Sequence, residues 1–349
     1  MKKDWMITES ELDDDQLRVL MSILDKSMVV TGCAGSGKSV LALMKAQRLQ
    51  QERDGDYEVI VYTKALRAYM EEGRRALGLT GRFIYYWQWE KRLGCPSADY
   101  VIVDEAQDFT EEELRAFIRA ARKHFYFFGD TAQSVYSQYK DTVRMEDIGY
   151  LVDRAARPKE AELYRNYRLP VPVARLAQEV GVDLPPFDEK IYQSKYRTGR
   201  YAPYVLRCRD LREQVDVVCR ELRRPGLDDA AILCATNDEV DAVHELLQAA
   251  GLRHELKSKT NGDTLSFSSD LPKVMTAHSA KGLQFDTVFV VSAETYLDDD
   301  QRRVLYVAMT RACRYLYLLH SGPFPDYFPA PSSGLYKTSL LSSSTIQDI

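Results

Sequence analysis

The stretch GCAGSGKS at 32–39 carries the residue types needed to hold a phosphate group. It matches the pattern G-x-x-x-x-G-K-[ST] in full, with glycines at Gly32, Gly35 and Gly37. Glycines let backbone N–H groups turn toward an anion without a clashing Cβ atom. Lys38 can neutralise charge on the β- and γ-phosphates, and the Ser39 hydroxyl can be a ligand of Mg²⁺. The apolar run before the loop and the helix-like sequence after it predict a strand–loop–helix unit whose helix N-terminus points at the anion.

A second stretch, DEAQD at 104–108, places two carboxylates directly after the apolar run YVIV. Asp104 stands at the end of this expected strand, where a carboxylate can hold Mg²⁺. Glu105 can orient and deprotonate an attacking water molecule. A phosphate loop alone is compatible with a kinase, a GTPase or a motor. The added base favours hydrolysis of a nucleoside triphosphate.

These two stretches together resemble motifs of the UvrD/Rep-like superfamily-one helicases, with DEAQD as motif II. The other motifs of the family follow in order between about residue 16 and about residue 320. The resemblance implies that ATP binds with Mg²⁺ in a cleft between two RecA-like domains and that its hydrolysis drives movement on nucleic acid. It also implies that Gln16 reads the adenine edge. Gln133, in FYFFGDTAQSVY at 125–136, would sense the γ-phosphate.

Two further motifs of the resemblance supply arginines. LYRNYRLP at 163–170 resembles motif IV, in which Tyr167 would stack on adenine and Arg168 would reach the γ-phosphate. RRVLYVAMTRA at 302–312 resembles motif VI, with Arg311 as a second arginine finger. A guanidinium group beside the γ-oxygens can be worth roughly 10³–10⁵ in rate. If both arginines reach one phosphate, the two halves of the chain must fold against each other; an ordinary surface ion pair is the alternative for each arginine.

The stretch VMTAHSAKGLQFDTVFVV at 274–291 resembles motif V. Gln284 stands where the family usually has glutamate, and its amide can still hydrogen-bond a ribose hydroxyl. Thr276 and His278 would contact the nucleic acid, although a buried imidazole is the alternative reading of His278. Upstream, VIVYTKALRAYM at 59–70 resembles the motif whose threonine, here Thr63, touches the nucleic-acid backbone.

Residues 64–92 combine basic charge with aromatic side chains. Seven lysines and arginines against three glutamates give a net charge of +4, and four of the aromatic residues cluster near its end: Tyr85, Tyr86, Trp87 and Trp89. Single-strand binding uses this combination. A solvated helix face followed by core aromatics is an equally weighted alternative. Tyr139 lies beside Gln138, the position where the family places a base-stacking aromatic residue.

The composition is that of an ordinary soluble, cytoplasmic protein. The 349 residues are 45% hydrophobic and 28% charged, with a net charge of −5. Because proteins that coat nucleic acid are usually basic, any contact with nucleic acid must be a local groove. No apolar run is long enough to cross a membrane, and the start is too acidic for a signal peptide. The six cysteines are scattered, which argues against a zinc site or a disulfide framework.

The alternation of apolar runs and helix-like stretches predicts an α/β fold with two RecA-like domains built on parallel sheets. We place the first domain at 1–155, the second at 156–322, and a Pro- and Ser-rich tail at 323–349 that is loosely ordered or docks on a partner. Only 30 residues (71–100) and 105 residues (169–273) separate the motifs where the family carries accessory subdomains. The chain therefore resembles a minimal two-domain core.

Two functions follow as hypotheses. The first is an ATP-driven motor on single-stranded nucleic acid, DNA favoured over RNA, with 3′-to-5′ movement implied by the resemblance. The second is an ATPase switch in a multi-protein DNA repair or defence complex, in which a partner protein supplies a nuclease or accessory function and unwinding by the chain alone is weak or absent. A small-molecule kinase is a distant third, because no lid for an acceptor is visible.

Overall fold

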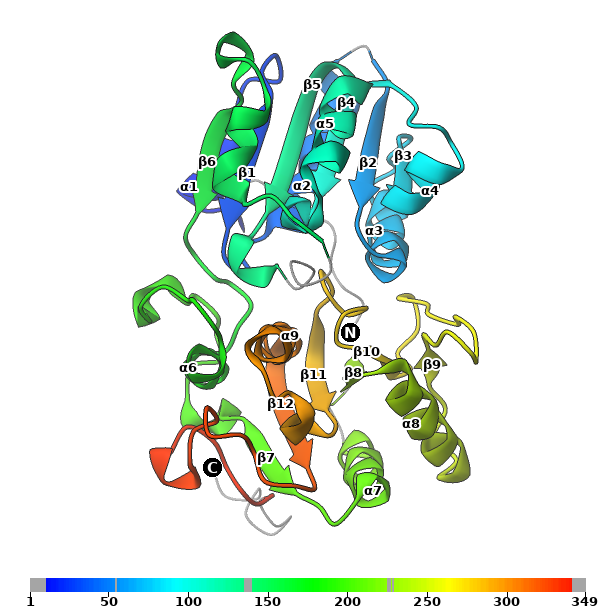
Figure 1. The fold of residues 1–349 in the computed structure, drawn as a ribbon, viewed down its shortest axis with the longest axis vertical. Helices are drawn as coiled ribbons and strands as arrows, with labels where there is room; N and C mark the ends of the chain where they lie inside the picture. Colours follow the sequence, from blue (N-terminus) through cyan, green and yellow to red (C-terminus); the bar gives the residue numbers. More distant parts are fainter. Residues whose placement is uncertain (1–10, 54, 135–139, 225–226, 228, 341–349) are drawn as a thin grey trace.

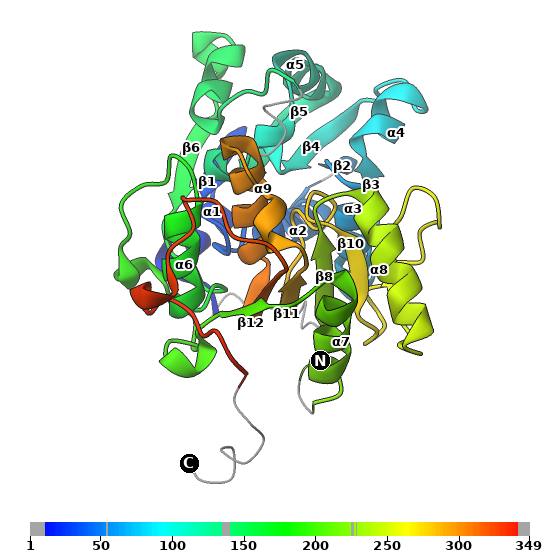
Figure 2. The ribbon, with the colours of Figure 1, turned by 60° about the horizontal axis from the view of Figure 1, so that its bottom comes forward.

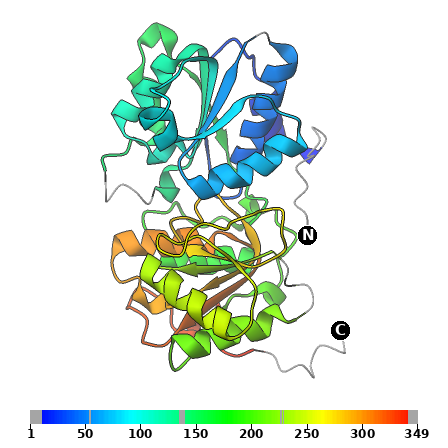
Figure 3. The ribbon, with the colours of Figure 1, turned by 90° about the vertical axis from the view of Figure 1, so that its right-hand side faces the viewer.

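The computed structural model describes residues 11–340, except 54, 135–139, 225–226 and 228. The described residues form two halves that lie one above the other, each built around its own sheet (Figures 1 and 3). Both sheets have six strands, and every strand pair within them is parallel. The predicted α/β fold with two parallel-sheet domains is confirmed.

The first sheet has the strand order β3-β2-β4-β5-β1-β6. Its strands are β1 (Met28–Gly32), β2 (Tyr57–Val61), β3 (Arg82–Tyr85), β4 (Ala98–Asp104), β5 (Ala121–Gly129) and β6 (Lys159–Leu163). Its helices are α1 (Asp14–Leu20), α2 (Lys38–Glu52), α3 (Lys64–Ala76), α4 (Tyr86–Lys91) and α5 (Glu111–Ala120).

Helices cover both faces of this sheet, which explains why its central strands are apolar throughout. On β4, Tyr100 and Ile102 join the core cluster that includes α2 and α3, whereas Val101 and Val103 join the cluster that includes α5. The parallel register brings the carboxyl ends of β1, β4 and β5 to one edge, with Thr31 opposite Gly129 and Asp104 opposite Phe128. Ligands of open parallel sheets bind at this edge.

The second sheet has the strand order β7-β12-β11-β8-β10-β9. Its strands are β7 (Tyr204–Arg207), β8 (Ala230–Cys234), β9 (Glu255–Leu256), β10 (Lys273–Thr276), β11 (Phe285–Val290) and β12 (Ala312–His320). Its helices are α6 (Val171–Val180), α7 (Leu211–Leu222), α8 (Asn237–Ala249) and α9 (Asp299–Met309). Figure 2 shows α7 beside α8 and α6 beside α9.

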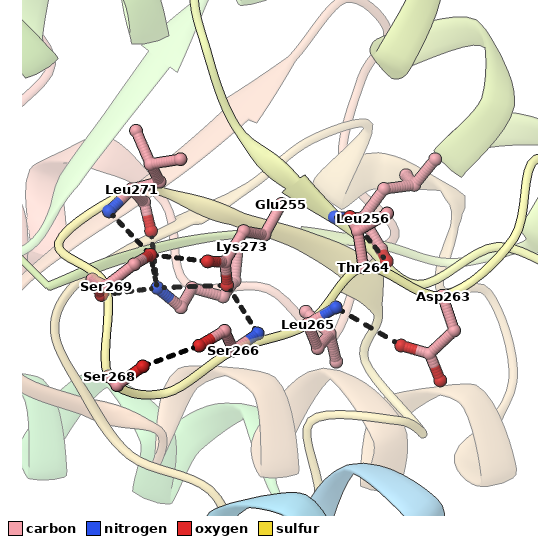
Figure 4. A network of polar contacts seen from close by, with 10 residues as sticks. All are labelled: Glu255, Leu256, Asp263, Thr264, Leu265, Ser266, Ser268, Ser269, Leu271 and Lys273. Carbon is pink, nitrogen blue, oxygen red and sulfur yellow. Dashed lines mark hydrogen bonds and ion pairs between the residues drawn. The ribbon is translucent and has the colours of Figure 1, made fainter.

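The segment between β9 and β10 is held by a network of polar contacts (Figure 4). The buried ammonium group of Lys273 donates to the carbonyl oxygens of Ser269, at 2.8 Å, and Leu271, at 2.6 Å, and lies 3.3 Å from Glu255. From this segment Phe267 reaches α3, where its ring meets the ring of Tyr69 edge-on with centroids 5.5 Å apart. The second half thus contacts the first through this segment.

The first sheet extends past the predicted boundary at residue 155. Strand β6, at 159–163, pairs with β1 along its whole length, because the chain returns to the free edge of β1 before it crosses to the second half. The division of the chain at 155 and 156 otherwise stays a prediction.

The prediction for the tail was wrong for its described part, 323–340. Phe328 is buried in the core of the second half and stacks on Phe324 with ring centroids 3.9 Å apart. The backbone of Lys337 bonds to the edge of the second sheet, donating to Pro203 O at 2.8 Å and accepting from Val205 N at 2.8 Å. Aromatic side chains give this segment apolar surface to bury, which its proline and serine content concealed. Across the described residues, we find no helix with the length and apolar character to span a membrane.

Candidate nucleotide-binding site

The phosphate loop joins β1 to α2 in a conformation that requires glycine. Gly35 and Gly37 have φ angles of +77° and +90°, in the left-handed region. A Cβ atom on Gly35 would lie 2.7 Å from Asn166 Oδ1, and one on Gly37 would lie 2.8 Å from Gln16 Nε2. Both glycines therefore permit the turn and the close approach of side chains from the two halves of the chain.

The side chains of Lys38 and Ser39 are held by their surroundings. Lys38 Nζ donates to Gly32 O at 2.7 Å and to Cys33 O at 3.0 Å, so its charge lies over the loop. Ser39 Oγ donates to Asp104 Oδ2 at 2.6 Å. The paired oxygens of Ser39 and Asp104 are the hard donors that Mg²⁺ prefers, so the residues present fit this ion.

The two carboxylates after β4 are buried but electrostatically different. Burial, followed by the negative charge of Glu105, raises the pKa of Asp104 to about 7. Burial alone would raise the pKa of Glu105 as well, but the nearby positive charges, that of Lys281 first, lower it below its usual value. Gln107 Nε2 donates to Glu105 Oε2 at 2.5 Å. Glu105 is thus held as an ionised acceptor that can take a proton from water.

Two guanidinium groups from the second half enter the site. Arg311 is buried; its Nε donates to Val307 O at 2.9 Å, and it also donates to Gln133 Oε1 of the first half. Burial, followed by the positive charge of Arg168, lowers the pKa of Arg311 to about 9. The Nε and Nη2 atoms of Arg168 are buried without a hydrogen-bond partner among the described residues. Two neighbouring cations, of which Arg168 has unpartnered donors among the described residues, indicate an anion site.

The residues predicted to hold the base and ribose also reach this site. Gln16 Nε2 donates to Ser36 O at 2.9 Å. The half-exposed Tyr167 donates through its hydroxyl to Asp13. Gln284 Nε2 donates to Tyr69 Oη at 3.1 Å. The pairing of Phe285 with Ala312 explains why Gln284 and Arg311, each one residue earlier, lie together.

One cavity of about 590 Å³ gathers most of the predicted site residues from the two halves of the chain. It is lined by Gln16, Gly35, Gly37, Lys38, Ser39, Glu105, Gln133, Tyr167, Arg168, Gln284 and Arg311. Gly32 and Asp104 are absent from the lining but bond to Lys38 and Ser39, which belong to it. The cavity lies between the carboxyl edge of the first sheet and the amino ends of β11 and β12.

Sequence reasoning missed several contacts around this cavity. Asn166 Oδ1 accepts from the backbone N–H groups of Arg168, at 3.0 Å, and Leu169, at 2.8 Å, and so shapes the turn that carries Arg168. Residues 193–196 line the cavity from the second half. Asp13, three residues before Gln16, follows the spacing of a capping box, which is a signal visible in the sequence.

The described residues among those predicted to bind nucleic acid lie outside the cavity lining. Thr63 caps α3, accepting from Leu66 N at 3.0 Å. Thr276 is buried and donates to Ser279 Oγ at 3.0 Å. Burial, followed by the charge of Lys281, lowers the pKa of His278, so its imidazole stays neutral at neutral pH. Tyr139 falls outside the described residues.

The aromatic segment 64–92 divides between surface and core. Trp87 is 42% exposed, with the guanidinium carbon of Arg92 5.6 Å from its ring centroid. Trp89 is buried and donates from Nε1 to Glu58 Oε2 at 2.9 Å. Trp87 therefore offers a surface for stacking, whereas Trp89 belongs to the core.

The fold and the phosphate loop define a two-domain α/β protein of the P-loop class. A family model described as "AAA domain" matches residues 11–144, and one described as "UvrD-like helicase C-terminal domain" matches residues 273–319. A "Probable DNA helicase" of Mycoplasma pneumoniae is 22% identical over 250 residues, which cover 64% of this chain and 44% of that protein. A "DNA helicase II" of Rickettsia typhi is 27% identical over 125 residues, which cover 27% of this chain and 19% of that protein.

Among solved structures, the C-terminal domain of a possible DNA helicase from Lactobacillus plantarum WCFS1 is 25% identical, with a TM-score of 0.39, over 49% of this chain and 98% of that one. The chain spans less than half the length of the two curated relatives. The family models and the two relatives agree with the ordered motifs and support a UvrD/Rep-like superfamily-one helicase.

Proposed function

We propose that this chain hydrolyses ATP in the cavity between its two domains and couples hydrolysis to movement along single-stranded DNA. The observation that carries the proposal is the convergence of Glu105 from the first domain with Arg168 and Arg311 from the second domain on one cavity that also contains the phosphate loop. A site built from both domains changes shape when the γ-phosphate leaves, because the second-domain arginines then lose their anionic partner.

The residues of the cavity divide the work of hydrolysis. Glu105 accepts the proton of the attacking water, and Gln133 senses the γ-phosphate. Lys38, Arg168 and Arg311 stabilise the charge that the transition state spreads over the γ-oxygens. Ser39 and Asp104 would hold Mg²⁺, which neutralises charge on the β- and γ-phosphates when it is bound.

The base and ribose would lie toward the other end of the cavity. Gln16 reads the adenine edge, Tyr167 stacks on the base, and Gln284 faces a ribose hydroxyl. The loop glycines Gly32, Gly35 and Gly37 let the backbone approach the phosphates.

The nucleic acid would run across the surface outside the cavity. Trp87 supplies an exposed ring for base stacking, which is worth about 1–3 kcal/mol per base. Thr63, Thr276 and His278 would touch the strand backbone at the ends of β2 and β10, which belong to different domains. A strand held by both domains advances when the domains close and reopen.

Displacement of streptavidin from biotinylated oligo-dT tests both the movement and its direction. We expect ATP-dependent displacement from the 5′ end, as 3′-to-5′ movement requires, and a loss of displacement in Trp87→Ala. Oligo-U in place of oligo-dT tests the preference for DNA. Absence of displacement from both ends would overturn the proposal.

A switch subunit of a DNA repair or defence complex is the second candidate. The described residues of the segments between the motifs, 71–100 and 169–273, hold elements packed on the two sheets and no separate subdomain. A chain of this kind would unwind duplex weakly unless a partner protein supplied the missing contacts. Stimulation of hydrolysis by a protein partner, without stimulation by oligo-dT, would favour this candidate.

A further inference from the structure

Asp13 lies where helix α1 meets the second domain. As the N-cap of α1, its Oδ1 accepts from Gln16 N at 2.7 Å, and its backbone N–H donates to Gln16 Oε1 at 3.1 Å. Gln16 Nε2 in turn donates to Ser36 O at 2.9 Å. The oxygen and the nitrogen of the Gln16 amide are therefore each held by a partner, and the amide has one fixed orientation.

The other carboxylate oxygen of Asp13 faces the second domain. Oδ2 accepts from the hydroxyl of Tyr167, 154 residues away in the chain, and lies 3.5 Å from Arg165 Nη1. Although burial alone would raise the pKa of Asp13, the hydrogen bonds from Gln16 N and Tyr167 keep it below its usual value. The ionised carboxylate thus caps the first turn of α1 through the backbone N–H of Gln16 and also binds a second-domain ring. The capped turn places the backbone N–H of Asp13 where it holds the Gln16 amide oxygen.

A fixed amide distinguishes adenine from guanine. Adenine offers an amino donor and a ring-nitrogen acceptor on one edge, which complement an amide oxygen and an amide N–H. Guanine offers two acceptors on the same edge. An amide with a fixed orientation would therefore place its oxygen against the guanine oxygen, where no hydrogen bond can form. Stacking on Tyr167, by contrast, accepts any base.

We propose that Asp13 is a positioning residue of the nucleotide site: it holds Gln16 for adenine selectivity and Tyr167 for base stacking, across the two domains. This inference rests on the proposed function. It assigns two separable roles to one carboxylate, because Oδ1 caps the turn that positions Gln16 and Oδ2 accepts from Tyr167.

Four variants separate the roles. Asp13→Asn keeps the N-cap acceptor for Gln16 N, and its amide nitrogen can donate to the Tyr167 oxygen in place of the lost acceptor. Asp13→Ser keeps an N-cap acceptor for Gln16 N but is too short for Tyr167. Asp13→Ala loses both, and Tyr167→Phe loses the hydroxyl bond while it keeps the ring. Equilibrium binding of ATP and of GTP is measured by calorimetry for each, with thermal unfolding as the control for folding.

We expect Asp13→Asn to bind like the wild type. Asp13→Ser and Tyr167→Phe should each weaken the binding of ATP and of GTP by the same factor. The double variant, Asp13→Ser with Tyr167→Phe, should bind no more weakly than either single variant. Asp13→Ala should in addition lower the ATP-to-GTP affinity ratio by about tenfold, within the range expected for a lost bidentate base contact.

Three results would overturn the inference, and they distinguish its failure from that of the proposed function. If the wild type binds ATP selectively and the ratio stays unchanged in Asp13→Ala, or Asp13→Ser and Tyr167→Phe add independently, the positioning role is wrong while the proposed function stands. If the wild type binds neither nucleotide, the proposed function fails and the inference fails with it.

Discussion

The ammonium group of Lys281 lies 2.6 Å from Asp108 Oδ1, although the two residues are 173 positions apart in the chain and belong to different domains. Lys281 also donates to the backbone oxygen of Gln133. The side chains of Lys281 and Asp108 are 1% and 0% exposed. In the sequence, Lys281 stands between Thr276, a predicted nucleic-acid contact, and Gln284, which lines the nucleotide cavity. Domain closure must accommodate this pair.

Breaking the pair should be costly for stability. Lys281→Met should lower the free energy of unfolding by about 3–5 kcal/mol, because it leaves the Asp108 charge buried without its cation. Asp108→Asn combined with Lys281→Met should recover part of this loss. The measurement is denaturant unfolding of the two single variants and the double variant. Lys257→Met, in the more exposed pair with Asp263, is the control and should lose less than about 1 kcal/mol; equal losses would contradict the prediction.

Removal of Arg168 should affect the chemical step. Arg168→Ala should lower kcat for ATP hydrolysis by roughly 10³-fold or more with little change in KM, because its unpartnered donors meet charge that develops in the transition state. Steady-state kinetics check this. Arg175→Ala removes a surface guanidinium of α6, which pairs with Glu189, and should leave kcat unchanged. A similar change in both variants would argue against a role for Arg168.

The histidine pair at the end of α8 should make stability fall in mild acid. His254 Nε2 lies 2.7 Å from His244 Nδ1, and His254 Nδ1 lies 2.8 Å from Leu252 O. Burial lowers the pKa of His254 below the usual 6.5, so the unfolded chain binds a proton more readily than the folded chain does. The contribution is therefore present above about pH 6.5 and is lost as pH falls through the lower folded pKa.

Unfolding free energies measured from about pH 7.5 to about pH 5 test this sign. Wild type should lose more stability over that range than His254→Phe, because the variant has no imidazole to protonate at this position. A steeper acid loss in the variant than in the wild type would show that the sign is wrong.

The tail packs on the second domain, so a substitution near the end of the described residues should lower the free energy of unfolding as a core substitution does. Phe328→Ala should lower the free energy of unfolding by about 3 kcal/mol, because a buried ring is deleted from a packed cluster. Denaturant midpoints give the value, and Tyr150→Ala, at a residue 67% exposed, is the matched control. If both substitutions prove equally mild, the tail does not contribute to this core.

Short-range patterns allowed much of the architecture to be predicted. The strand–loop–helix unit around Lys38 and the acids after β4 are contiguous in sequence, and glycine spacing and apolar runs determine their geometry locally. The parallel sheets then bring those strand ends together, and the cavity contains most of the predicted residues.

Contacts between distant segments were the part that the sequence did not reveal. The bonds of Asp13 with Tyr167 and of Lys281 with Asp108 depend on how the two domains pack, which no local pattern encodes. Composition also failed to separate Trp87 from Trp89, two residues apart, because burial depends on which side of the short helix α4 faces the sheet. The tail was misjudged because its aromatic residues were given less weight than its prolines and serines.

The most direct test of the central claim is steady-state ATP hydrolysis by the purified chain with and without oligo-dT, with Glu105→Gln as the reference. The account predicts hydrolysis that rises strongly with oligo-dT and that disappears in Glu105→Gln, while calorimetry shows that the variant still binds ATP. Hydrolysis that persists in Glu105→Gln, or that is indifferent to oligo-dT in the wild type, would contradict the account of this chain as a motor on single-stranded DNA.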